Sequence, residues 1–219
     1  YTLLAINKSI PGTTLTAQYA TLDGKDTVFS ADLYYLEAAY AGKAGDFTYG
    51  VAANYEFKST DKITTGVKED DGTMYGAKLS LGYSDLKTYV AYTKITDDGN
   101  VAGLDGGAGF GGGAQTAFAQ GKGNKTGTYD ADTRAYSIDA NYDFKSIGLL
   151  AGARYTNLKY GDATTVTSAN KDKEFGFTDL YATYSFTGAL KGLATEVIYQ
   201  DWSKDADGHD FWFKANYKF

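Results

Sequence analysis

Cysteine is absent from this sequence of 219 residues, and histidine, methionine and proline occur once each. Without cysteine the chain has no thiol nucleophile, no thiolate metal site and no disulfide. Long apolar runs are also lacking: no stretch reaches the roughly 18–20 apolar residues of a membrane helix, and the mean hydropathy is −0.36. The net charge of −6 argues against a nucleic-acid partner, which needs a basic surface.

Tyrosine, by contrast, is abundant, with 20 residues in a chain that is 16% aromatic. Its apolar ring and polar tip suit a membrane–water interface. Apolar and polar residues alternate with period two along the segments 15–19, 34–40, 47–57, 75–83, 136–144, 149–155, 180–186, 193–199 and 211–219. This period indicates β-strands, since apolar residues do not recur at the spacing of a helix.

The apolar stripes have aliphatic or small residues in the middle and aromatic residues at the ends. That depth profile is typical of a surface facing lipid. Short links lie at 11–12, 42–45, 84–87, 144–147 and 187–192, and they alternate with longer polar links at 22–26, 59–73, 96–132, 161–173 and 203–208. Bacterial barrels alternate short periplasmic turns with extracellular loops in this way. The sequence therefore predicts an all-β fold, an antiparallel transmembrane β-barrel.

The strand count in this barrel is about eleven, whereas single-chain bacterial barrels have even numbers. We expect residues 1–219 to form a single β-barrel domain that is the C-terminal portion of a longer barrel. The alternative is a complete barrel of about ten or twelve strands, with one strand miscounted near 26–33. The sequence opens at Tyr1-Thr2-Leu3-Leu4 without a signal peptide, which an outer-membrane protein needs, so we expect a processed chain or a fragment.

The chain resembles the porins of Gram-negative bacteria, most closely the major outer-membrane porin of Campylobacter-type bacteria. The resemblance rests on the terminal Tyr217-Lys218-Phe219, the tyrosine-rich strands, and the acidic loops Asp97-Asp98-Gly99-Asn100 and Asp205-Ala206-Asp207-Gly208. It implies a homotrimer of barrels with about 16–18 strands, a water-filled lumen and an inward-folded constriction loop. It also implies outer-membrane lipid and lipopolysaccharide as surroundings, and a barrel-assembly machinery that recognises Tyr217 and Phe219.

The predicted function is passive diffusion of ions and small hydrophilic solutes through the lumen, without an enzymatic reaction or a cofactor. Charged residues on the polar side of the strands are the predicted pore lining: Glu37, Glu56, Lys78, Asp139, Arg154, Asp179, Glu196 and Lys214. Acidic residues outnumber basic ones on this side, which predicts a weak cation preference. Arg154 either sets up a field across the lumen or forms structural ion pairs, and the sequence favours neither.

The longest link, 96–132, contains a glycine-rich run at 106–113. This run matches the dinucleotide-binding motif G-x-G-x-x-G, but the match does not indicate a dinucleotide site, because no βαβ unit surrounds it. The link is either a flexible loop that folds into the pore or over its mouth, with Phe110 and Phe118 as packing anchors, or a mobile surface loop. The sequence slightly favours the surface loop.

Two further features carry weak hypotheses. Asp205, Asp207 and Asp210 have a spacing that suits Ca²⁺, although Asp and Gly are common in any turn. His209 lies beside Asp207 and Asp210, which suggests a hydrolase with its active site at the rim of the barrel. No second catalytic cluster accompanies it in the sequence, however. The main alternative to a porin is a non-conducting barrel that acts as an adhesin or surface anchor. A soluble β-sandwich is the last alternative.

Overall fold

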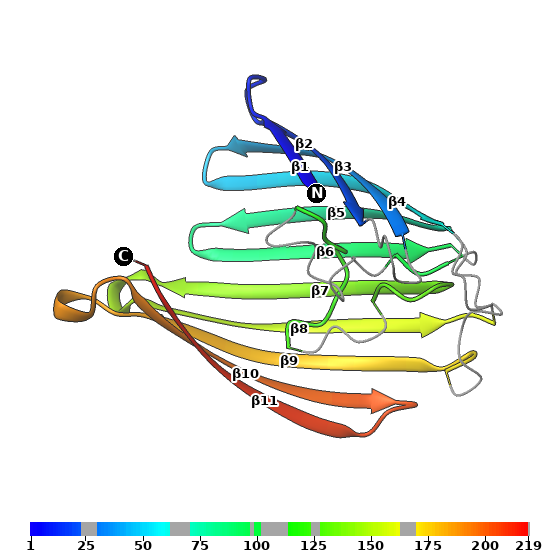
Figure 1. Cartoon of the computed structure of the whole chain (residues 1–219). Helices are drawn as coiled ribbons and strands as arrows, with labels where there is room; N and C mark the ends of the chain where they lie inside the picture. Colours follow the sequence, from blue (N-terminus) through cyan, green and yellow to red (C-terminus); the bar gives the residue numbers. More distant parts are fainter. Residues whose placement is uncertain are drawn as a thin grey trace.

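The computed structural model describes residues 1–22, 30–61, 71–96, 99–101, 114–123, 128–162 and 170–218. Within these ranges, eleven strands form one antiparallel sheet, and each strand pairs with the next one in sequence (Figure 1). The strands are β1 (Thr2–Asn7), β2 (Thr13–Leu22), β3 (Ser30–Ala44), β4 (Phe47–Asp61), β5 (Gly72–Tyr83), β6 (Leu86–Ile95), β7 (Thr133–Phe144), β8 (Leu149–Tyr160), β9 (Glu174–Ser185), β10 (Leu193–Lys204) and β11 (Gly208–Tyr217). Two 3₁₀ turns, η1 (Lys145–Ile147) and η2 (Gly188–Leu190), lie between strands.

The fold class and the strand count predicted from the sequence are confirmed. Period-two alternation places every second side chain on the same face, so the hydrophobic pattern sets both the strands and their register. Residues 26–29, where the sequence leaves room for another strand, lie outside the described residues, and β3 begins at Ser30. In the part of the chain that the structure describes, no helix is long and apolar enough to cross a membrane.

Successive connections alternate between the two ends of the sheet (Figure 1). The short turns β1–β2, β3–β4, β5–β6, β7–β8 and β9–β10 lie at one end, and the C-terminus lies there too. The other connections leave the opposite end, and most of them are longer. The β10–β11 connection, residues 205–207, is shorter than the β9–β10 turn, so the predicted strict alternation of short and long links is wrong at this position. Tight turns between strands often need a residue with a positive φ angle, and Gly12 in the β1–β2 turn has φ +74°. A Cβ at Gly12 would lie 2.7 Å from the carbonyl oxygen of Ala41, so glycine is required on both grounds.

The outer, convex face of the sheet is apolar. A row of exposed aliphatic side chains crosses four neighbouring strands, because β4 to β7 pair in a register that sets these residues side by side: Val51, Leu79, Val90 and Ile138. Aromatic side chains lie toward both ends of the strands. The ring centroids of Tyr19 and Tyr34 lie 5.1 Å apart near the β2–β3 connection, and those of Phe47 and Tyr83 lie 4.7 Å apart at the short turns, both pairs with tilted rings.

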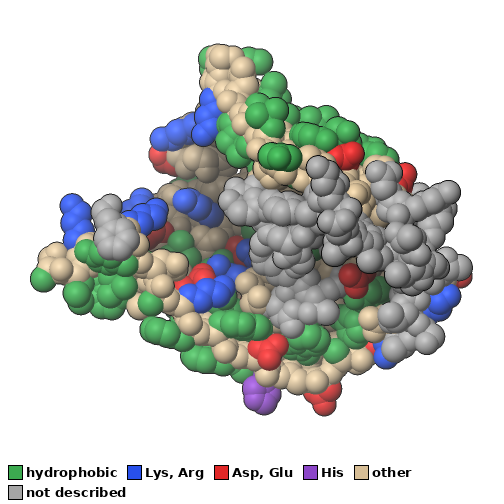
Figure 2. All heavy atoms as spheres, viewed as in Figure 1, with side chains coloured by type: hydrophobic (Ala, Val, Ile, Leu, Met, Phe, Trp, Pro, Cys, Tyr) green, Lys and Arg blue, Asp and Glu red, His purple; other side chains and the backbone are tan. Residues whose placement is uncertain are grey.

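The inner, concave face is hollowed, and charged side chains of both signs gather in the hollow (Figure 2). Residues 114–123 cross this face, and we call this segment the strap. Two apolar clusters lie between the strap and the sheet; both contain inward-facing strand residues and strap residues, and the first also contains Val101 and Tyr129 from the β6–β7 connection. The first holds Ala20, Leu33, Tyr35, Met74, Ile95, Val101, Ala117 and Tyr129, and the second Ala91, Ala119, Ala135, Leu158, Tyr160 and Phe177.

Candidate functional site: the concave face and its strap

All eight residues that the sequence predicts for the pore lining lie on the concave face. The pairing of the strands brings several of them together, because Asp139 of β7, Arg154 of β8 and Asp179 of β9 are direct neighbours across the sheet. Glu196 of β10 stands opposite Lys214 of β11 in the same way. Glu56, Asp139 and Asp179 are almost fully buried, so that other groups rather than open solvent surround them.

The strap accounts for much of that burial. The sheet, which we call the wall, binds the strap through side chains of six strands. At its start, the amide of Ala114 donates to Gln18 Oε1 of β2 over 2.5 Å. In its middle, the amide of Ala119 donates to Thr93 Oγ1 of β6 over 3.0 Å. At its end, a Cβ at Gly123 would lie 2.2 Å from the indole of Trp212 on β11, so the strap reaches the last strand.

Arg154 connects the wall to the middle of the strap. Its Nε donates to Asp139 Oδ2 over 2.9 Å, and its Nη1 donates to the carbonyl oxygen of Gln120 over 3.2 Å. The carbonyl of Gln120 also accepts from Thr156 Oγ1 over 3.1 Å. The guanidinium lies 5.4 Å from the centre of the Tyr89 ring. Arg154 therefore forms the structural ion pair that the sequence left as one of two possibilities.

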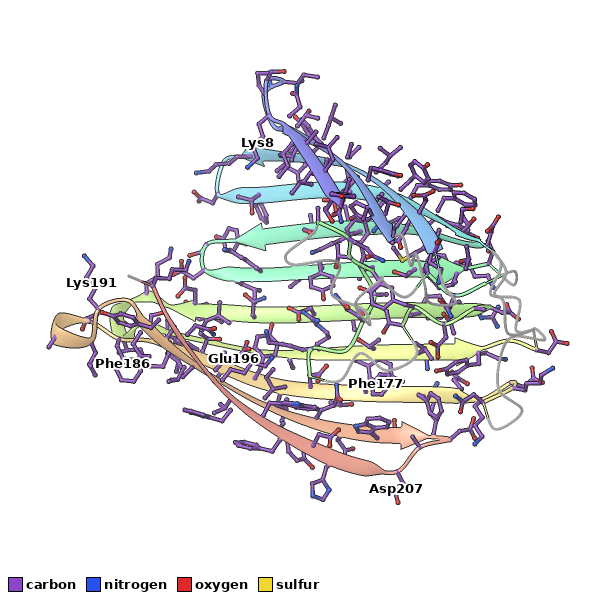
Figure 3. All side chains as sticks on the ribbon, in the orientation of Figure 1. Lys8, Phe177, Phe186, Lys191, Glu196 and Asp207 are labelled. Carbon is purple, nitrogen blue, oxygen red and sulfur yellow. The ribbon has the colours of Figure 1, made fainter. Side chains whose placement is uncertain are left out.

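Carboxylates hold the far end of the strap. Asp179 accepts hydrogen bonds from the amides of Lys122 (2.9 Å) and Gly123 (3.4 Å). The Lys122 ammonium lies 2.7 Å from Glu196 Oε1, and Lys214 lies 3.5 Å from the other oxygen of Glu196. Figure 3 labels Glu196 and also Phe177 of β9, which lies on the same face further along the strands, opposite Trp202.

The near end of the strap rests on β4. Gln115 Nε2 donates to Glu56 Oε1 over 2.5 Å and to the carbonyl oxygen of Val101 over 3.1 Å. Asn54 Nδ2 donates to the carbonyl oxygen of Thr116 over 2.6 Å. Side chains of the wall thus satisfy the main-chain groups of a segment that has neither helical nor strand hydrogen bonds.

A cavity of about 750 Å³ opens beside the strap, toward the short-turn end of β2 to β7. Phe118 of the strap lines it together with Glu37, Lys78, Lys87 and Tyr89. The Lys78 ammonium lies 4.3 Å from the centre of the Tyr89 ring. The surface next to the strap is therefore open to solvent and carries charged groups of both signs among apolar side chains.

The strap corrects the slight preference of the sequence for a surface loop. Residues 114–123 are folded onto the concave face because wall residues bind their backbone and because Ala117 and Ala119 are buried in the two apolar clusters. Phe118 packs against the second cluster, as expected of an anchor. Phe110 and the rest of the glycine-rich run lie outside the described residues.

The Ca²⁺ candidates are not brought together. Asp205 Oδ2 accepts from the amide of Glu174, and Asp210 Oδ2 accepts from the Trp202 indole. Within the described ranges no group of three or more acidic or histidine side chains is arranged to hold a metal ion. His209 shares the outward face of β11 with Phe211, whereas Asp210 points inward, so the two do not form a catalytic pair.

Comparison with known proteins adds structural relatives only. No family model matches the sequence, and no curated protein matches it. Pseudomonas aeruginosa OccK8 (OprE) superposes with a TM-score of 0.76 at 18% identity, over 99% of this chain and 57% of that one. Acinetobacter baumannii OccAB2 gives 0.68 at 18% identity, over 99% and 53%. The outer membrane protein OpdK from Pseudomonas aeruginosa gives 0.64 at 15%, over 98% and 68%.

The chain has the fold of an outer-membrane β-barrel. It spans a little over half of the length of OccK8 and OccAB2. At these identities the likeness concerns the fold, and the relatives' residues are not carried over to this chain.

Several residues of the site escaped prediction from the sequence. Gln18, Asn54 and Thr93 hold the strap, yet uncharged polar residues on a strand carry no signal that sets them apart. The inward-facing Leu33 and Met74 break the polar pattern expected of a lumen. Such apolar residues on the polar face were the available sign that something packs there.

Proposed function

We propose that the chain forms part of the wall and the constriction of a diffusion channel for ions and small hydrophilic solutes in the bacterial outer membrane. The observation that carries the proposal is the strap, which crosses a charged concave face while the opposite face is apolar. An apolar exterior suits lipid, and a polar interior narrowed by an inserted segment suits a size-selective passage. Passage requires no reaction and no cofactor.

The channel needs a closed barrel. In the described part of the sheet β1 pairs only with β2, and β11 only with β10. Unpaired strand edges do not occur in the hydrocarbon of a membrane, because each free N–H and C=O group costs several kcal/mol. We therefore propose that these edges pair with further strands in a longer barrel of about 16–18 strands, to which this chain contributes one domain.

The partners belong to the same proposal. The aromatic residues toward both strand ends suit contact with outer-membrane lipid and lipopolysaccharide. Tyr217 lies at the end of β11, and Phe219 lies outside the described residues; together they remain the predicted signal for the barrel-assembly machinery. A homotrimer and kinship with the Campylobacter-type porin also remain predictions, based on the resemblance of the sequence.

The charge preference of the pore is the finer part of the proposal. The acidic excess among the predicted lining residues supports a weak preference for cations. The structure adds basic groups to the same face, namely Lys87 beside the cavity and Lys122 on the strap. The preference is therefore expected to be small, because the accessible charges of the two signs nearly balance.

The test is single-channel recording of the full-length protein in a planar bilayer under a salt gradient. Stepwise openings support the channel, and a reversal potential on the cation side supports the charge assignment. Phe118→Ala is expected to raise the conductance, because it removes a ring that borders the cavity. Phe47→Ala, on the outer face, is the matched control and is expected to leave it unchanged. A folded, inserted barrel without current would overturn the proposal and favour the adhesin or surface anchor.

A further inference from the structure

Glu56 has an unusual environment for a carboxyl group. It is fully buried on β4, beneath the strap. Its Oε1 accepts a hydrogen bond from Gln115 Nε2, but its Oε2 has no hydrogen-bond partner. Burying a carboxylate is costly unless both of its oxygens are paired. One oxygen of Glu56 is thus left without a donor when the group is ionised.

Gln115, the partner of Glu56, also has a buried side-chain atom without a hydrogen bond. Its amide nitrogen uses both hydrogens, one on Glu56 and one on the carbonyl oxygen of Val101. Its Oε1 is buried and has no hydrogen-bond partner. A protonated carboxyl group carries one O–H donor in addition to its acceptor. A proton on Glu56 is therefore what the unpaired Oε1 of Gln115 lacks, and an acid and an amide can then share two hydrogen bonds.

We propose that Glu56 and Gln115 form a proton-controlled latch for the near end of the strap. With Glu56 protonated, its O–H donates to Gln115 Oε1 while Gln115 Nε2 donates back, and residues 114–117 are held on β4. With Glu56 ionised, the second hydrogen bond is lost and two electron-rich oxygens remain buried without donors. This end of the strap then loosens, whereas the far end keeps its ion pair between Lys122 and Glu196.

Among the described residues, the other charged or titratable groups around Glu56 do not offer the same switch. Lys58, on the same face of β4, donates to Asn100 Oδ1 over 2.7 Å. Tyr35 of β3 donates to Glu37 Oε2 over 2.6 Å, and Tyr129 accepts from the amide of Ala117 over 3.2 Å. Lysine and tyrosine keep their charge between acidic and neutral pH. Glu37 is the other carboxyl group in this neighbourhood, and β5 contributes the uncharged Met74 opposite Glu56.

The latch is tested by the mobility of the strap, which does not depend on ion current. The chain has no cysteine, so Thr116→Cys in the full-length protein takes a single nitroxide spin label. In the reconstituted barrel, the label is expected to be immobilised at acidic pH and to gain a mobile component toward neutral pH. Glu56→Gln, which keeps the shape and supplies a permanent donor, is expected to stay immobilised throughout. Glu37→Gln is the control and is expected to keep the transition.

Two results would overturn the latch. One is a spectrum of the labelled Thr116→Cys protein, with Glu56 intact, that does not change with pH while heat-modifiable gel mobility shows a folded barrel. The other is a pH transition that persists in Glu56→Gln. Should that variant fail to fold, Gln115→Leu acts from the strap and is expected to be mobile at every pH; an immobile label there would equally contradict the latch. The pH dependence of the current rests on the proposed channel, so a latch without current would count against the channel alone.

Discussion

Asp139 shows how a single buried residue organises the concave face. It accepts hydrogen bonds from Arg154 Nε at 2.9 Å, from the Tyr181 hydroxyl at 2.9 Å and from Asn141 Nδ2 at 3.0 Å. Three donors compensate a charge that is almost completely removed from water. Arg154 supplies the positive charge and also binds the strap. Removing Arg154 would leave a buried, partly compensated carboxylate.

Arg154→Gln is therefore expected to lower the free energy of unfolding by about 3–5 kcal/mol, the usual cost of breaking a buried ion pair. Urea unfolding of the protein in lipid vesicles measures this free energy. Arg134→Gln is the matched control, because Arg134 on β7 is exposed, and it is expected to change the stability little. Equal losses in the two variants would show that the Arg154 ion pair does not stabilise the wall.

The strap is the element that covers part of the concave face. It has no regular secondary structure, so its position depends on wall side chains spread from β2 to β10 and on the fit of Gly123 against Trp212. Distributed anchors mean that loosening one end need not release the other. Each end is therefore expected to respond separately to substitution.

Gly123→Ala is expected to displace the far end of the strap, because the added Cβ would lie 2.2 Å from a ring atom of Trp212. Tryptophan emission is expected to move to longer wavelength, with stronger quenching by iodide, as the indole becomes more exposed. Gly50→Ala is the matched control, since its nearest contact would be an ordinary 3.4 Å. An unchanged spectrum in Gly123→Ala would mean that the strap end and Trp212 do not pack together in the membrane.

At the scale of the whole molecule, the sheet has an apolar outer face and a charged inner face. This difference in polarity indicates which face contacts lipid and which contacts water. Neighbouring residues of β5 sample both: Leu79 is exposed on the outer face, and Ser80 borders the cavity on the inner face. In water, the outer aliphatic row would be an unusually large apolar patch for a monomer. In a bilayer, the same row faces hydrocarbon and the inner charges face the lumen.

Leu79→Lys is accordingly expected to lower the free energy of unfolding in lipid vesicles by about 2–4 kcal/mol, the cost of lysine at the bilayer midplane. Ser80→Lys, one residue away, is expected to cost little stability, because its side chain enters the water-filled side. Unfolding of both variants in the same vesicles provides the measurement. A similar cost at the two positions would be incompatible with lipid on one face and water on the other.

The facing of the strand residues was predictable, since Glu37 and Lys214 lie on the side that the alternation indicates. The partners of those residues were not. The ion pair between Arg154 and Asp139 was one of two roles that the sequence left open for Arg154. Asp205, Asp207 and Asp210, although close together in sequence, do not converge. Leu33 and Met74 departed from the alternation because they pack beneath the strap, which the local pattern of β3 and β5 does not reveal.

The sequence by itself determined the strands, their faces and the positions of the connections, because side-chain period and turn chemistry are local properties of the chain. Only the tertiary structure decided where residues 114–123 lie. That segment has no periodicity, and it is held by residues far away in sequence, such as Gln18, 96 positions before Ala114. Contacts at such separation arise only when the sheet has curved enough to present Gln18, Glu56 and Asp179 to the same passing segment.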